Sequence, residues 1–410
     1  MVTADERRGV RRIAGARLVS LAGSGAAFAA LAYIVFHLTG ESTAWASYTL
    51  LCTIGAQGLF VSVASGLGDR FDRRRVLVIA DLAAAALFVV LAFMRTPGQY
   101  LLVAFLIAVI ESPIYVVSAA AIPNLVRSEG ISWANSVVAF GRNVGNLIGP
   151  ALGGLLVAIF APGTTNDADA LHRAGMWVFM LNAVTFGISA WLVGSTPGRF
   201  SDEWSEDSLA EHRGTVAGLR FMIKEPVLRT IAVAWAVLLL GLGMTIVAEP
   251  ALADVFDSGS IGYGLLASAW GGGSVIGVVV AQRRLHADNE FAWLIAAVLV
   301  GGVGFGATAV APVLSLALLC MVVGGVGEGV GGVAEQGIFQ RRTPDEVRSR
   351  VLGALEATIL LSLAASFLIG GWVVGVIGAR WAYGIGGVSF LLAAAILAPT
   401  YVREHPLTAS

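Results

Sequence analysis

Acidic and basic side chains that interrupt long apolar segments are the residues of this sequence best placed to do chemistry. Glu111 and Arg142 stand near the middle of two successive apolar segments, and Glu328 stands among glycines in a later one. An ionisable group inside a membrane segment is costly, and it indicates a substrate path, a proton relay or a charge pair. Because the two segments that carry Glu111 and Arg142 run in opposite directions, these side chains are expected to approach each other. The pair either exchanges a proton or is structural, and the sequence leaves both open.

Other residues inside apolar segments are candidates for lining a substrate pocket. They are Tyr115, Trp235, Glu249 and Trp270. For the aromatic residues, packing in the core competes with this role. Three further acids, Asp81, Glu335 and Glu356, lie near segment ends. We expect these three to pair with arginines at the membrane surface rather than with a substrate.

The elements that must position these residues are long apolar helices. Hydrophobic residues make up 57% of the chain and charged residues only 13%, whereas a soluble domain carries about 25% charged residues. A helix of about 20 apolar residues crosses a bilayer. About twelve segments satisfy this requirement, at 13–38, 45–65, 76–94, 99–122, 133–161, 175–194, 230–253, 260–281, 291–310, 313–337, 350–377 and 380–402. The sequence therefore predicts an all-α membrane protein with twelve transmembrane helices.

The arginines predict how the helices are oriented. Four of them lie between the second and third segments, and the N-terminal region up to Arg17 is also rich in arginine. The loops on the other side hold only Arg95, Arg173 and Arg380. Loops rich in arginine stay in the cytoplasm. We therefore expect a multi-pass membrane protein with both termini in the cytoplasm.

One long hydrophilic connection divides the chain. It covers residues 199–229 and separates an N-terminal bundle of six helices (1–198) from a C-terminal one (230–410). Part of the connection, Glu211–Lys224, is expected to form a helix on the cytoplasmic face.

The two halves repeat. Pro123–Ser128 reads Pro-Asn-Leu-Val-Arg-Ser, and Pro344–Ser349 reads Pro-Asp-Glu-Val-Arg-Ser. The same offset places Gly154 over Gly375. A constant offset along about 30 residues indicates an internal repeat, so the two bundles are expected to be pseudo-symmetric.

The loop after the second segment resembles the loop between helices 2 and 3 of the major facilitator superfamily. The family pattern is Gly-x-Leu-Ala-Asp-Arg-x-Gly-Arg-Arg, and here Ser65 and Asp72 stand where glycine is usual. The resemblance implies that the loop is a cytoplasmic gate. Its acid would cap the helix predicted at 350–377 in the outward-facing state, and its second arginine would bind an acidic or carbonyl group near the end of segment 99–122. A solvated basic loop is the alternative. The matching residues are Asp69, Arg70, Arg73 and Arg74.

The fifth segment carries a glycine pattern similar to that on helix 5 of antiporters in this superfamily. It reads Gly145-x-x-x-Gly149-Pro150-x-x-Gly153-Gly154. Glycines at this spacing let a neighbouring helix approach closely, and Pro150 removes a helix hydrogen bond. The resemblance implies a helix that rocks during transport, and plain tight packing is the alternative. Exporters of the family often carry an arginine in helix 4, where this chain has Glu111 instead.

The resemblance, closest to drug and siderophore exporters, implies a secondary transporter of the bacterial inner membrane. It also implies a substrate site between the two halves near the midplane. The expected reaction is export of an amphipathic small molecule by alternating access, a multidrug type of efflux coupled to protons by antiport. A dedicated exporter of one metabolite, such as a siderophore, is the alternative. A membrane sensor is disfavoured because the connection 199–229 is short for a soluble domain. The expected partners are the substrate, protons and the lipid bilayer, with the chain a monomer. The sequence carries no nucleotide-binding loop and no His/Cys metal spacing, so we expect no enzyme activity, cofactor, metal or nucleic acid.

Overall fold

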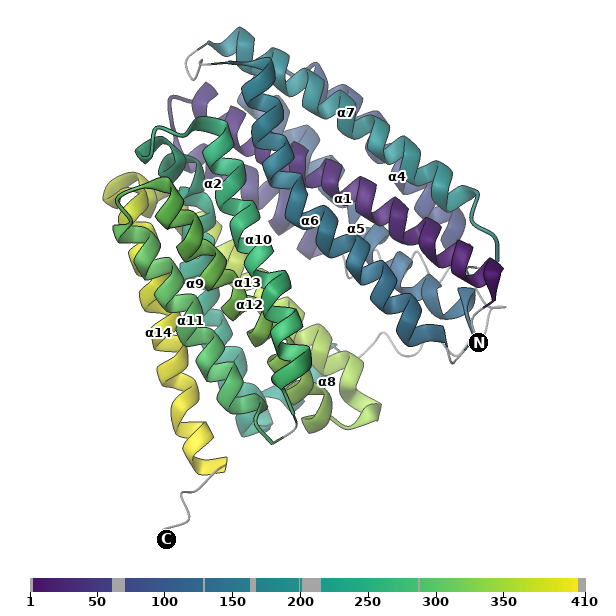
Figure 1. Cartoon of the computed structure of the whole chain (residues 1–410), viewed down its shortest axis with the longest axis vertical. Coiled ribbons are helices and arrows are strands. Elements are labelled where there is room, and N and C mark those ends of the chain that lie inside the picture. Colours follow the sequence, from purple (N-terminus) through teal and green to yellow (C-terminus); the bar gives the residue numbers. More distant parts are fainter. Residues whose placement is uncertain are drawn as a thin grey trace. The chain divides into compact units, whose positions relative to one another are not determined.

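The structure is a computed structural model that describes residues 3–60, 71–127, 130–162, 167–198, 200, 215–286 and 288–404. These residues form helices and connections without a strand (Figure 1). The helices are α1 (Ala4–Leu38), α2 (Thr43–Leu50), the π-helix η1 (Leu51–Gly55), α4 (Arg73–Ala92), α5 (Pro97–Leu125), α6 (Ile131–Phe160), α7 (Ala168–Gly194), α8 (Thr215–Lys224), α9 (Pro226–Val255), α10 (Gly259–Arg284), α11 (Glu290–Val310), α12 (Leu314–Arg342), α13 (Asp345–Ile377) and α14 (Ala379–Glu404).

Eleven helices within the described residues are long and apolar enough to cross a membrane. The all-α membrane architecture predicted from the sequence is thus confirmed, whereas the count of twelve spans is not. The predicted span 45–65 is the missing one. Its first part is helical through α2, η1 and the turn up to Phe60, and its remainder lies outside the described residues. In the predicted surface helix Glu211–Lys224, α8 covers Thr215–Lys224, and the first four residues are not described.

Local sequence signals fix where the helices begin. Thr3 and Glu6 form a capping box at the start of α1, and Thr96 and Gln99 form another at the start of α5. Such a box satisfies N–H groups that have no partner within the helix. Asp72 caps α4 by accepting a hydrogen bond of 2.9 Å from the backbone N–H of Arg75. The acid that replaces the usual glycine of the family loop therefore has a local structural role.

The chain folds into two units, each compact by itself. The first comprises Met1–Leu209 with Ser258–Ser268, and the second comprises Ala210–Asp257 with Ala269–Ser410. The division predicted from the sequence, at 198 and 230, stays a prediction.

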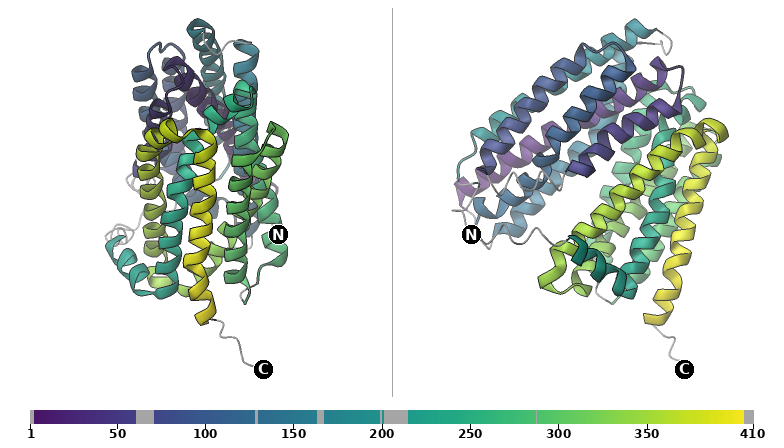
Figure 2. Two further views of the ribbon diagram at one scale, coloured as in Figure 1. Left: turned by 90° about the vertical axis from the view of Figure 1, so that its left-hand side faces the viewer. Right: turned by 180° about the vertical axis from the view of Figure 1, so that it is seen from behind.

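Within the first unit, α1 is the central helix. It packs against α6 and α7, and α4 packs against both α5 and α7. Figure 1 shows α1 running alongside α6 and α7. Within the second unit, α9 packs against α13 and α14, and α11 packs against α12 and α14 (Figure 2). The cavities described below are lined by residues of both α1 and α5.

The repeated segments of the two halves differ in their local structure. α5 continues through Pro123 to Leu125, whereas α12 ends at Arg342 and Pro344 is the N-cap of α13. The repeat found in the sequence therefore does not extend to identical helix ends.

Candidate functional site

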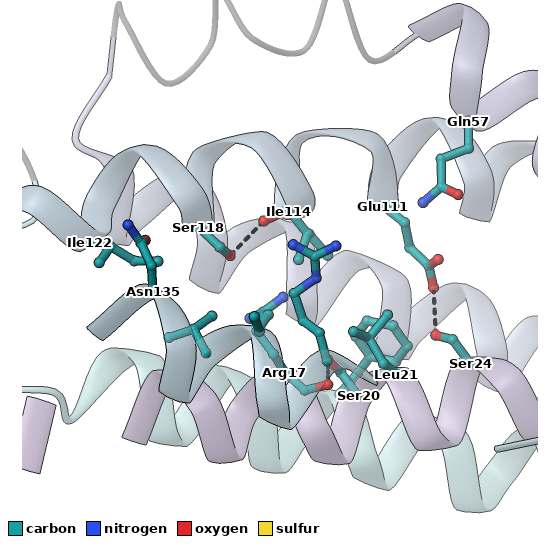
Figure 3. A pocket seen from close by; sticks show the side chains of 14 residues that line it. Arg17, Ser20, Leu21, Ser24, Gln57, Glu111, Ile114, Ser118, Ile122 and Asn135 are labelled. Carbon is teal, nitrogen blue, oxygen red and sulfur yellow. Dashed lines mark hydrogen bonds between the residues drawn. The ribbon is translucent and has the colours of Figure 1, made fainter. Parts of the chain in front are cut away.

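A polar cavity of about 240 Å³ lies inside the first unit, between α1, α5 and α6. Both Glu111 and Arg142, predicted from the sequence as a pair, line this cavity. Figure 3 shows the cavity from close by. The remaining lining residues are Arg17, Ser20, Leu21, Ser24, Gln57, Ile114, Ser118, Ile122, Asn135, Val138, Ala139 and Phe186.

Glu111 is held by a hydroxyl group. Its Oε1 atom accepts a hydrogen bond of 3.2 Å from Ser24 Oγ, and the two side chains point toward each other from α5 and α1 (Figure 3). Gln57 also lines the cavity. The hydrogen bond described for Glu111 thus goes to Ser24, and the predicted role of Glu111 and Arg142 as a pair stays a prediction.

A second cavity of about 320 Å³ adjoins the first. The two share Leu21, Ser24, Gln57 and Glu111. Most other residues of the second cavity are apolar, and they include Phe28, Leu31, Phe88, Leu91, Ala104, Ile107 and Ala108. The first cavity has more polar and charged lining residues than the second, and Glu111 is one of the four residues that line both.

The glycine pattern of α6 packs directly on the backbone of α1. A Cβ atom on Gly145 would lie 2.8 Å from Leu18 O, and one on Gly149 would lie 2.9 Å from Ala22 O. Real Cβ atoms essentially never come so close, so these positions require glycine. The pattern is therefore a close-packed seam between two helices. Its further role in transport stays a prediction.

The other residues of the pattern follow the same seam or lie beside it. Gly153 faces Ala26, one turn further along α1, and Pro150 lies inside the continuous helix α6. Gly154 faces Ser260 and Gly264, which belong to the segment Ser258–Ser268 of the first unit.

A buried ion pair lies beside the polar cavity. Arg17 is 3% exposed and Asp81 is fully buried. Arg17 Nη2 lies 3.1 Å from Asp81 Oδ2 and donates to Ser189 Oγ at 3.0 Å, while Ser189 Oγ donates to Asp81 Oδ2 at 2.7 Å. Asp81 therefore pairs with an arginine, as expected, and the pair is buried inside the bundle. Its predicted depth near the membrane surface stays a prediction. Arg17 is buried, whereas Arg7, Arg8 and Arg11 of the same helix α1 are exposed.

The spacing of buried residues contains a signal for this pair. On α1, Val10, Ile13, Arg17 and Ser20 are all buried, and they follow the three- and four-residue steps of one helix face. Asp81 stands in the same relation to Leu77, Ala84 and Phe88 on α4. Both charges lie on the stripe that faces the bundle interior, a pattern that charge counting overlooks.

The gate loop predicted from the sequence is described only in part. Asp69 and Arg70 lie outside the described residues. Arg74 Nη2 donates to the carbonyl oxygen of Gly198 at 2.5 Å, and its guanidinium lies 4.7 Å from the centre of the Phe200 ring. Arg74 therefore ties the start of α4 to the segment that follows α7. Arg73 is the first residue of α4, and its predicted partner near the end of α5 stays a prediction.

The side chain of Tyr115 is not described. The side chains of the other predicted pocket residues line neither of these two cavities. Trp270 stacks on Phe305 with ring centres 4.7 Å apart, which favours a packing role for it. Glu249 is 7% exposed in α9, and Glu328 and Trp235 are half-buried in α12 and α9. All three belong to the second unit, and a substrate role for them stays a prediction.

Comparisons with known proteins agree with this fold. A model of the Major Facilitator Superfamily matches residues 13–288 and 231–410. The enterobactin exporter EntS of Escherichia coli O81 (strain ED1a) is 24% identical over 343 residues, which cover 82% of this chain and 78% of the relative. The same exporter of Escherichia coli O139:H28 (strain E24377A / ETEC) matches to the same extent.

Solved structures show the same architecture at low sequence identity. A variant of the nucleoside transporter NupG superposes with a TM-score of 0.76 at 13% identity, covering 96% of this chain and 100% of that one. A bacterial homologue of the iron transporter ferroportin in the inward-facing state gives a TM-score of 0.73 at 17% identity, covering 96% and 98%. Because the family model matches most of the sequence and the helical architecture agrees, this chain belongs to the Major Facilitator Superfamily.

Proposed function

We propose that this protein exports an amphipathic small molecule across the bacterial inner membrane by alternating access, in exchange for protons. The observation that carries the proposal is Glu111, an acid that lines both cavities of the first unit and whose described hydrogen bond is to a neutral hydroxyl. A carboxyl group inside a membrane segment is a functional group by default. Because Glu111 lines both cavities, one group can contact both the proton and the substrate.

The other predicted residues have supporting roles in this proposal. Asp69 closes the cytoplasmic side by attraction to the N-terminus of α13, whose partial positive charge favours an acid. The seam of Gly145, Gly149 and Gly153 keeps α6 against α1, so that the wall of the cavity moves as one body. Arg142, which lines the same cavity as Glu111, is the proposed partner of that acid.

The test of proton coupling is transport into proteoliposomes with and without a pH gradient. In Glu111→Gln we expect substrate binding and downhill exchange to remain and uphill accumulation to be lost. If Glu111 only neutralises a buried charge, the same change instead lowers folded yield. Asp169→Asn is a matched control, because that side chain is 81% exposed, and it should leave accumulation unchanged. Normal uphill accumulation by Glu111→Gln would refute the role of Glu111 and make Glu328 the next acid to test.

A second candidate function is export of one dedicated metabolite, such as a siderophore. The relatives named as enterobactin exporters, 24% identical over 82% of this chain, favour it. The two candidates differ in selectivity. A panel of dyes and siderophores offered to the same proteoliposomes distinguishes them, because a dedicated exporter is inhibited by one compound class while a multidrug exporter is inhibited by many.

A further inference from the structure

The short helix α8 lies directly before a membrane-spanning helix. It ends at Lys224, and α9, one of the helices that can cross a membrane, begins at Pro226. α9 has 30 residues and is therefore about 45 Å long, which exceeds a hydrocarbon core of about 30 Å. Its first turn carries the exposed Arg229. We therefore expect the start of α9, and α8 beside it, to lie at the level of the lipid headgroups.

One face of α8 packs inside the second unit. The helix contacts α13 and α9. Met222 is 2% exposed, Gly218 is buried and Phe221 is half-buried. These three residues follow the three- and four-residue steps of a single helix face. The opposite face of α8 therefore points away from the unit.

The outward face of α8 is divided into two edges. Leu219 and Ile223 are 42% and 51% exposed, and Arg220 and Lys224 are exposed as well. Residues four positions apart are neighbours on a helix surface, so an apolar edge runs alongside a basic one. A helix that is divided in this way lies in the plane of a membrane interface, with its apolar side chains at the acyl boundary and its basic ones at the headgroups.

The positive charges on this side of the second unit have no acidic partner in the part of the chain that the structure describes. No described acid forms an ion pair with Arg220, Lys224 or Arg229. Glu225 directly follows Lys224 in the sequence, but its carboxylate accepts a hydrogen bond of 2.6 Å from the backbone N–H of Leu228 and lies 3.4 Å from Arg342 Nη1. The outward face is therefore complementary to a negatively charged surface.

Two kinds of negative surface could cover this face. The connection before α8 is one of them, because it carries Asp202, Glu203, Glu206, Asp207 and Glu211. Carboxylates would pair with the basic edge but would offer no apolar partner to Leu219 and Ile223. A bilayer that contains anionic phospholipid matches both edges at once, since phosphates contact the cations and acyl chains contact the apolar side chains. The two edges together therefore favour the lipid.

We propose that α8 lies on the membrane surface and binds anionic phospholipid headgroups. Arg220, Lys224 and Arg229 contact the phosphates, and Leu219 and Ile223 enter the acyl boundary. This inference goes beyond the proposed function and does not depend on which molecule is transported, so the failure of either leaves the other standing.

The chain supplies its own probe for a test. Lys224 is the only lysine of the sequence, so an amine-reactive reagent modifies α8 at one position. Arg283→Lys adds a reference amine at an exposed position in the last turn of α10. The full-length Arg283→Lys protein is placed in nanodiscs of phosphatidylcholine alone or mixed with phosphatidylglycerol. Initial rates of acetylation by a sulfosuccinimidyl ester are then measured at both positions by peptide mass spectrometry.

The ratio of the rates at positions 224 and 283 is the informative quantity, because the repulsion of the anionic reagent by a negative membrane affects both sites. With phosphatidylglycerol this ratio should fall at least about threefold, since the phosphates hold the amine of Lys224. High salt should restore the ratio, because it screens such contacts. Equal ratios in the two kinds of nanodisc would overturn the proposal, including equal protection by the acidic connection.

Variants separate the two edges. Arg220→Gln weakens the basic edge and Leu219→Gln the apolar one, and each should raise the ratio with phosphatidylglycerol toward its value in phosphatidylcholine. Both side chains are exposed, so melting temperatures in detergent should stay unchanged. Arg403→Gln is the matched control, because it removes an exposed arginine from α14 of the same unit, and it should leave the ratio unchanged. Full protection of Lys224 in either α8 variant would contradict the proposed placement of that edge.

Discussion

Arg17 Nη2 lies 3.1 Å from Asp81 Oδ2, and both side chains are buried between α1 and α4. Ser189 on α7 is hydrogen-bonded to both of them. One polar cluster therefore links three helices of the first unit, at the edge of the cavity that Arg17 lines. Removing one charge of such a pair is more harmful than removing both, because an isolated buried charge has no compensation.

This asymmetry gives a stability prediction. Asp81→Asn should lower the free energy of unfolding by about 3–5 kcal/mol, the range for breaking a buried ion pair from one side, and it should reduce folded yield. Arg17→Gln/Asp81→Asn should recover most of the loss. The measurement is the melting temperature and the monodisperse fraction of a fluorescent fusion in detergent. Asp169→Asn breaks the exposed pair with Arg95 and should change stability by less than about 1 kcal/mol. A double variant as unstable as Asp81→Asn would contradict this account.

The glycine seam makes a second prediction. Gly145→Ala places a methyl group 2.8 Å from Leu18 O, so α6 must move away from α1. Overpacking of this kind costs about 1–3 kcal/mol. Gly187→Ala is the matched control, because a Cβ there meets nothing within 4 Å and alanine favours a helix by about 1 kcal/mol over glycine. Melting curves should therefore move in opposite directions for the two variants. Equal shifts in melting temperature for the two variants would show that Gly145 does not lie in the close contact with Leu18 described above.

The gate loop makes a third prediction, drawn from the sequence because Asp69 lies outside the described residues. Asp69→Asn keeps the size of the side chain and removes its attraction to the N-terminus of α13, a contribution on the order of 1 kcal/mol. That change shifts a balanced equilibrium several-fold. Expression should stay near normal while transport is lost and the inward-facing population grows, as measured by spectroscopic distances between labels on the two faces. An unchanged population with unchanged transport would refute the gate role.

The orientation of the chain is tested by cysteine labelling. After replacement of Cys52 and Cys320, single cysteines at positions 169 and 258 should react with an impermeant maleimide added to whole cells. Cysteines at positions 74 and 208 should react only after the membrane is opened. This pattern follows from the arginine-rich loops, which stay on the cytoplasmic side. External labelling at position 208 would contradict the division into two halves.

Proton-coupled export predicts a voltage dependence. Export of an uncharged molecule in exchange for one proton moves one elementary charge across the membrane, which is worth about 2.3 kcal/mol per 100 mV. Clamping the membrane potential at zero with valinomycin and potassium should then reduce accumulation more than tenfold, even at a constant pH gradient. Accumulation that ignores the potential would mean that the exchanged charges cancel.

The long apolar segments can be predicted because membrane helices are set by length and hydropathy, which neighbouring residues determine. The predicted span 291–310 differs from α11 by one residue. The polar cluster cannot be placed by the same reasoning. Arg17 follows four other N-terminal arginines and groups with them in a charge count, although its partner comes from a helix that begins at Arg73. Which helices meet is decided by packing in three dimensions, and a one-dimensional charge count does not contain that information.

The cavity illustrates the same limit. Glu111 and Arg142 are identifiable from their depth in single segments, and the structure places both at one cavity. Ser24 and Gln57 are not, because an isolated serine or glutamine in an apolar helix is unremarkable until its neighbours are known. The π-helical turn before Gln57 has no signal in the sequence that we recognise.

The burial of Arg17 also bears on how the chain enters the membrane during synthesis. A charged arginine at the centre of a membrane helix raises the free energy of insertion by up to about 3 kcal/mol, and by less nearer an end. Its counter-charge, Asp81, is synthesised 64 residues later, and the hydroxyl of Ser189 follows another 108 residues on. We expect the first turns of α1 to stay near the lipid headgroups until α4 has emerged from the ribosome and Asp81 can pair with Arg17. The ion pair thereby links the final depth of the first helix to the arrival of the third span, and ribosome pausing between them would prolong this shallow intermediate.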